Sequence, residues 1–167
     1  MKKVYIPILF IIAFISFGAC EKDDICVDGD TPLMVIRFYD VDNPTVLKKA
    51  TKFRIVGVGQ NTTVTTVSDR TDLDSISIPL KVTEDSTGFY FIKNSADVDS
   101  LEVGDLDTLY FNYTRKNIFV SRACGYITNY DDLSSDLQTE TDNWIKDIEI
   151  VNPLVENSTE AHVKIFH

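Results

Sequence analysis

The stretch Ser-Ile-Ser-Ile-Pro-Leu at residues 75–80 indicates the fold class of this chain. Its apolar residues Ile76, Ile78 and Leu80 alternate with serine or proline, so an extended strand here has one apolar face and one polar face. Pro79 has no N–H to donate to a sheet, so we expect this strand at an edge or ending there. A strand buried on one side only is typical of antiparallel sheets.

Similar β-rich runs lie on both sides of this stretch, separated by turn residues, and no helical periodicity persists between them. The other predicted strands are 33–39, 53–58, 62–67, 89–93, 108–114, 118–122, 144–151 and 161–166. We expect a tight hairpin turn at 115–117, a polar loop at 131–143, and His162 on the polar face of the last strand. The prediction is an all-β fold, an antiparallel β-sandwich (immunoglobulin-like or related) of about eight to nine strands.

Composition excludes several classes of function. The chain has 167 residues, 16 Lys and Arg against 26 Asp and Glu, and a net charge of −10, which disfavours nucleic-acid binding. Hydrophobic residues make up 44% of the chain, enough for a packed core in one domain. Three cysteines and two histidines offer little material for a zinc site, and we expect no metal and no cofactor.

The N-terminus has the layout of a secretory signal. Two lysines at 2–3 precede an apolar run at 4–17, which is followed by Gly18-Ala19-Cys20. This ending resembles the lipobox of bacterial lipoproteins, in which the cysteine sulfur is acylated and the signal is cut before it. We expect a signal peptide at 1–19, a lipidated acidic tether at 20–31 and a β-sandwich domain at 32–167.

Acylation of Cys20 would hold the protein on its membrane without a spanning helix. Each buried CH2 contributes about 0.8 kcal/mol, and two or more acyl chains give stable attachment. Loss of residues 1–19 removes two lysines and no acids, so the mature charge becomes −12. The next residues, Glu21, Lys22, Asp23 and Asp24, resemble the export signal of surface lipoproteins in Bacteroidota. We therefore expect an outer-membrane protein that faces the cell surface, or otherwise the periplasmic face.

The other two cysteines, Cys26 and Cys124, form an even pair in an exported domain, which favours one disulfide. It would join the end of the tether to a strand or loop near the middle of the domain. Two free thiols are the alternative.

The order of several short motifs resembles a family of Bacteroidota lipoproteins of unknown function. The motifs are Cys20-Glu21-Lys22-Asp23-Asp24 with Cys26, Thr31-Pro32, Phe38-Tyr39-Asp40, Asp74-Ser75-Ile76, Pro79-Leu80, 110–113, Ala123-Cys124-Gly125 and 148–152. The resemblance implies a lipid-anchored, all-β envelope protein. It supplies no substrate, cofactor or catalytic residue.

Candidate chemistry is sparse. Four pairs of aspartates two residues apart suit calcium by ligand type, but the EF-hand pattern is missing and solvated charge at strand ends explains them better: Asp40/Asp42, Asp72/Asp74, Asp97/Asp99 and Asp105/Asp107. There is no Gly-x-Ser-x-Gly motif for a serine nucleophile and no glycine-rich phosphate loop. We expect no catalytic residue.

Tyr126, Tyr130 and Trp144 flank the polar loop and could stack on a sugar ring. The leading interpretation is a non-enzymatic outer-membrane lipoprotein, an interaction or structural component of the envelope. The alternative is a glycan- or small-ligand-binding module that uses these three aromatics. Expected partners are the membrane, through the lipid on Cys20, and an envelope protein or glycan.

Overall fold

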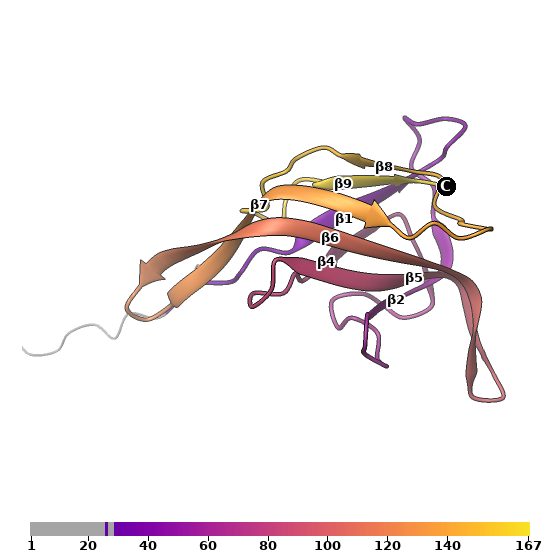
Figure 1. Ribbon diagram of the computed structural model, residues 1–167, viewed down its shortest axis with the longest axis horizontal. Helices are drawn as coiled ribbons and strands as arrows, with labels where there is room; N and C mark the ends of the chain where they lie inside the picture. The colour runs from indigo at the N-terminus through magenta and orange to yellow at the C-terminus, as the bar shows by residue number, and fades with distance from the viewer. Residues whose placement is uncertain (1–25, 27–28) are drawn as a thin grey trace, which may run out of the picture.

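The computed structural model describes residue 26 and residues 29–167, and these form an all-β fold (Figure 1). The strands are β1 (Met34–Tyr39), β2 (Ala50–Gly57), β3 (Thr71–Leu73), β4 (Ser75–Ile78), β5 (Ser86–Val98), β6 (Leu101–Ser121), β7 (Gly125–Leu137), β8 (Asp147–Ile150) and β9 (Val163–Phe166). In this part of the chain, no helix is long and apolar enough to cross a membrane. The predicted fold class is confirmed.

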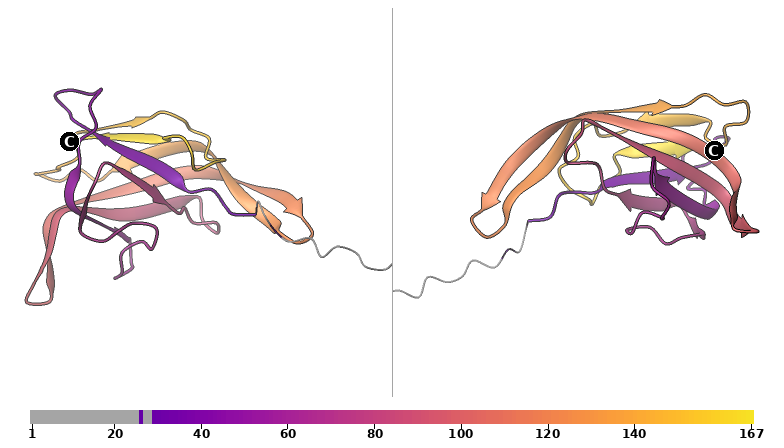
Figure 2. Two further views of the ribbon diagram at one scale, coloured as in Figure 1. Left: turned by 180° about the vertical axis from the view of Figure 1, so that it is seen from behind. Right: turned by 60° about the horizontal axis from the view of Figure 1, so that its bottom comes forward.

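The strands form two sheets. One has the order β4-β1-β9-β8 and the other the order β3-β2-β5-β6-β7. All pairings are antiparallel except that of β1 with β9, where Ile36 lies opposite Val163. The final strand therefore enters the middle of the smaller sheet beside the first strand, and both views of Figure 2 show these two strands together.

The core lies between the two sheets. Met34, Ile36 and Phe38 alternate on the inner face of β1, and Phe53 and Ile55 do the same on β2. The rings of Phe38 and Phe53 lie 5.2 Å apart and connect the sheets. Each such side chain contributes about 1.5–3 kcal/mol by leaving water, so this layer supplies most of the free energy of folding.

The prediction of a turn at 115–117 is wrong, because these residues lie inside β6, a strand of 21 residues. Arg115 pairs with Tyr130 and Lys116 with Asn129, so the ladder runs through 115–117 and, after a register shift between Phe119 and Ser121, reaches the turn after Ser121. β7 also includes residues 131–137, which were expected in a loop. Polar side chains fit both strands there because their outer faces are open to water.

The predicted strand at 62–67 is also wrong. Residues 62–67 lie in a turn-rich loop, which pairs with the sheet through a single bridge between Val56 and Thr63. The Thr63 hydroxyl donates to Asp69 at 2.8 Å, an example of a threonine side chain that supports a loop rather than a ladder. The short strand β3 follows this loop.

His162 was expected on the surface and is fully buried, which corrects that prediction. It lies just before β9, and two hydrogen bonds fasten it to β1. The ring Nδ1 of His162 accepts from the Val35 N–H at 3.0 Å, and the backbone N–H of His162 donates to the Val35 carbonyl at 2.9 Å. Burial lowers the pKa of His162, while the charge of Glu160 acts in the opposite direction.

The lowered pKa of His162 predicts a loss of stability in mild acid. The unfolded chain, with an imidazole pKa of about 6.5, binds more protons than the folded chain, so the free energy of unfolding falls as pH drops below that value. In His162→Asn the amide oxygen can still accept from Val35 but does not titrate. We expect the urea midpoint of this variant to fall less than that of the parent between pH 7.5 and pH 5.

The carboxylates and His167 titrate in both proteins and cancel in the comparison. Equal losses of urea midpoint in the parent and the variant would contradict this account of His162.

Candidate functional site

Beyond the sandwich, β6 and β7 continue as a two-stranded hairpin at one end of the molecule, on the left in Figure 1. Residues 118–127, here named the hairpin tip, carry large exposed apolar side chains. Phe119 is 56% exposed and Tyr126 is 70% exposed, and their rings lie 5.3 Å apart on one face of the hairpin. Ile118 pairs with Ile127 on the other face. The tip therefore presents apolar groups to water on both faces.

The predicted disulfide between Cys26 and Cys124 is confirmed, and it fastens the tether to the hairpin tip. A Cβ at residue 29 would overlap the Sγ atoms of both cysteines, so Gly29 allows the chain to pass the disulfide. Further along, the Thr128 N–H donates to the Thr31 hydroxyl at 3.3 Å. The two cysteines are 98 positions apart in the sequence, and the chain-entropy estimate of stabilisation is about 4–5 kcal/mol.

The residues expected to carry the lipid and the export signal lie outside the described part of the chain. These are Cys20, Glu21, Lys22, Asp23 and Asp24.

The prediction that Tyr126, Tyr130 and Trp144 form one ligand platform is wrong. Tyr130 is 0% exposed and Trp144 is 5% exposed, since both belong to the core. The Tyr130 hydroxyl donates to the Leu80 carbonyl at 3.0 Å, and the Trp144 indole N–H donates to the Phe91 carbonyl at 3.2 Å. Neither ring has a free face for a sugar, and only Tyr126 is accessible.

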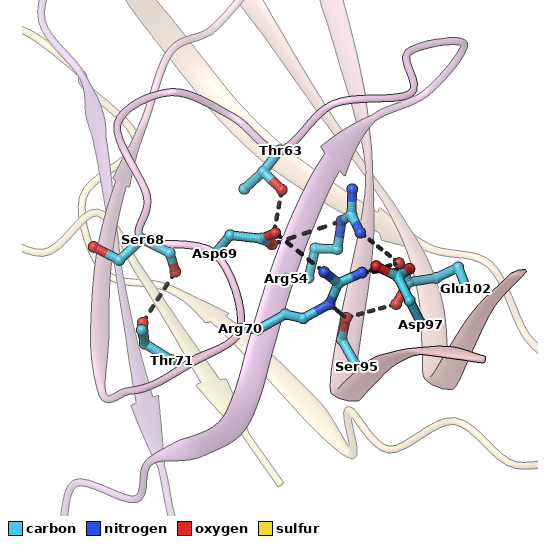
Figure 3. A network of polar contacts seen from close by, with 9 residues as sticks. All are labelled: Arg54, Thr63, Ser68, Asp69, Arg70, Thr71, Ser95, Asp97 and Glu102. Atoms are coloured by element: carbon cyan, nitrogen blue, oxygen red, sulfur yellow. Dashed lines mark hydrogen bonds and ion pairs between the residues drawn. The ribbon is translucent and has the colours of Figure 1, made fainter. Parts of the chain in front are cut away.

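Figure 3 shows a polar network where β2 meets the β5–β6 hairpin, near the end of the molecule opposite the hairpin tip. Arg54 binds Glu102 at 2.6 Å, and Arg70 binds Asp97 at 2.7 Å and Glu102 at 3.0 Å. Asp69 adds a third carboxylate, 3.6 Å from each arginine. Three acids thus surround two arginines, and the network is net negative.

A surface pocket of about 400 Å³ adjoins this network. Its lining includes Arg54, Tyr90, Gln60, Asn61 and Glu102. An aromatic ring beside two amides can contact a polar, uncharged ligand such as a sugar, whereas the excess of carboxylates disfavours an anion. This site has no signature in the sequence, because its residues come from β2, β5, β6 and a loop and share no local pattern.

Carboxylates from all four calcium-candidate pairs accept hydrogen bonds from protein donors. Asp40 accepts from the Asp42 N–H at 3.0 Å, a bond that lowers its pKa. Asp107 is buried, accepts from the Ile145 N–H at 2.8 Å, and has its pKa raised by burial. The remaining bonds are those of Asp72 with the Lys52 N–H, Asp97 with Arg70, and Asp105 with Asn94. Within residues 26 and 29–167, no three His, Cys, Asp or Glu side chains form a group that could hold a metal ion.

Both histidines are buried, and Cys124 is covalently bonded. His162 is buried against Val35, and the buried His167 lies edge-on to Trp144 with ring centroids 5.3 Å apart. Burial lowers the pKa of His167. Cys124 is in the disulfide and has no free thiol.

Comparison with known proteins identifies the family of this chain. No curated protein and no solved structure matches the chain. Residues 52–167, which extend from β2 to the C-terminus and contain Cys124, match a family described as a family of unknown function, DUF6452. The match covers more than half of the chain, which therefore belongs to the DUF6452 family.

Proposed function

We propose that this protein is a lipid-anchored outer-membrane protein that displays its β-sandwich at the cell surface as a non-enzymatic interaction or structural component of the envelope. The main observation that supports this proposal is the disulfide between Cys26 and Cys124. Disulfides persist in oxidising compartments outside the cytoplasm, which agrees with an N-terminal export signal and acylation at Cys20.

The disulfide also supports a tethering role for the N-terminal segment. Cys26 follows the proposed lipid attachment site by six residues, so the anchor connects directly to the hairpin tip. A chain fastened at one end of an elongated domain leaves the opposite end free for partners.

Three features favour a binding or structural role over catalysis. Both histidines are buried, and Cys124 is oxidised. The arginines of the polar network are neutralised by carboxylates at 2.6–3.0 Å, which is the arrangement of a supporting network rather than of a site that stabilises a developing negative charge.

Acylation predicts metabolic labelling by a palmitate analogue. The parent protein should incorporate label and fractionate with membranes, while Cys20→Ser should incorporate none, because it lacks the sulfur that accepts the diacylglyceryl group. The matched control is Cys26→Ser/Cys124→Ser, which keeps Cys20 and should label like the parent. Equal labelling of the parent and Cys20→Ser, or labelling of neither, would remove the proposal.

Surface display is tested by protease treatment of intact cells. We expect the parent to be digested and a variant with Lys22, Asp23 and Asp24 all changed to Ala to be protected, because the acidic export signal is lost while Cys20 remains. Disruption of the cells should expose both proteins to the protease. Protection of the parent in intact cells would restrict it to the periplasmic face.

The pocket beside Tyr90 supports a second candidate function, binding of a glycan or another polar, uncharged ligand. A glycan array probed with the parent should then reveal a ligand, and Tyr90→Ala should weaken its binding at least about tenfold, or ~1.4 kcal/mol. Tyr126→Ala is the control, because Tyr126 is exposed at the other end of the molecule. A loss of binding in Tyr126→Ala alone would move the site to the hairpin tip, and no bound glycan would count against this function.

A further inference from the structure

The hairpin tip has an apolar surface that nothing in the described chain covers. Tyr126 is the most exposed large apolar side chain of this part of the protein, and Ile118 and Phe119 are exposed beside it. A two-stranded hairpin has no second layer, so apolar side chains on either face meet water unless another surface covers them.

The tip also lacks the acidic side chains that dominate the composition of the chain. Between residues 118 and 127 the only charged side chain is Arg122. Arg115 and Lys116, at the base of the hairpin, are paired with Asp85 and Asp131. In a chain with ten more acids than bases, the tip is thus a segment that an anionic surface does not repel.

The tether determines which surface the tip can reach. Six residue steps separate Cys20 from Cys26, and an extended chain spans about 3.3–3.6 Å per residue. The disulfide adds 4.9 Å between the Cα atoms of Cys26 and Cys124, so Cys124 lies within roughly 25 Å of residue 20. This step rests on the lipid anchor proposed above. Such a short connection keeps the tip at a high effective concentration beside the bilayer, so even weak contacts persist.

We propose that the hairpin tip contacts the membrane that holds the acyl chains, with Phe119 and Tyr126 in the interface between headgroups and hydrocarbon and Arg122 at the lipid phosphates. Aromatic rings concentrate at this interface because they have an apolar body and, in tyrosine, a polar end. An arginine can place its stem in the apolar layer and its guanidinium among the phosphates. Lipid attachment and tip contact together give the domain two points of support and a defined orientation.

The opposite end of the molecule provides the matched comparison. The β5–β6 hairpin also ends in exposed apolar residues, Val98, Leu101 and Val103, and Leu101 is 69% exposed. Three acids lie beside them in the sequence: Asp97, Asp99 and Glu102. The two hairpins project from opposite ends in Figure 1. Only one end can rest on the membrane. The β6–β7 tip is favoured because it has no acidic residue and because the disulfide joins it to the tether.

The test measures the depth of each end in a bilayer. Acylated full-length protein carrying Tyr126→Trp is reconstituted into vesicles of phosphatidylethanolamine and phosphatidylglycerol that contain brominated acyl chains, which quench nearby tryptophans. We expect quenching of Tyr126→Trp to exceed that of Leu101→Trp at least about twofold. The buried Trp144 gives the same background in both proteins, and the parent, in which it is the sole tryptophan, measures that background. Circular dichroism checks that each variant is folded.

Adding Phe119→Ser to Tyr126→Trp should reduce the quenching, because the second interfacial ring is lost. Equal quenching of the two hairpins would overturn the proposal. So would a blue-shifted but unquenched Tyr126→Trp, since another protein chain would then cover the tip.

Palmitate labelling separates the two proposals. A labelled but unquenched protein removes only the contact of the hairpin tip, whereas a protein that takes up no label removes the anchor and the contact together.

Discussion

The length of β6 is the constraint on which the rest of the molecule depends. Its 21 residues span about 70 Å at 3.3–3.4 Å per residue, whereas the strands of the smaller sheet have four to six residues and cover about 13–20 Å. A second layer exists only over the middle of β6, where Leu109, Phe111 and Tyr113 are buried. The two ends must leave the sandwich as two-stranded hairpins.

A two-stranded hairpin is only marginally stable in water by itself, so each end needs support from elsewhere. At one end, the disulfide and the bond between Thr31 and Thr128 hold the tether along β7. At the other, Arg54 and Arg70 share Glu102 and connect β2 and its loop to the β5–β6 hairpin. A single exposed ion pair contributes about 0–1 kcal/mol, but a shared carboxylate orders both arginines at once.

These two supports lie at opposite ends of the molecule. The proposed lipid anchor and membrane contact lie at the hairpin tip, while the pocket near Tyr90 and Glu102 lies toward the opposite end. In the proposed orientation the bilayer holds the tip, and the pocket projects away from it toward soluble partners. An acidic domain suits this arrangement, because it approaches anionic lipid through a segment that has no acids.

The sequence by itself determined the local features: alternation at 75–80, strand-forming runs, and an even cysteine pair that indicated the disulfide. The strand features depend only on neighbouring residues. The cysteine pair follows because Cys26 and Cys124 are the two cysteines left once Cys20 is assigned to the lipid. Only the tertiary structure decided that Tyr130, Trp144 and His162 are buried, and that β6 passes straight through 115–117. Aromatic, histidine and polar residues fit either environment, so their burial and pairing depend on which strands the fold brings against them. The pocket likewise exists only once distant strands pair.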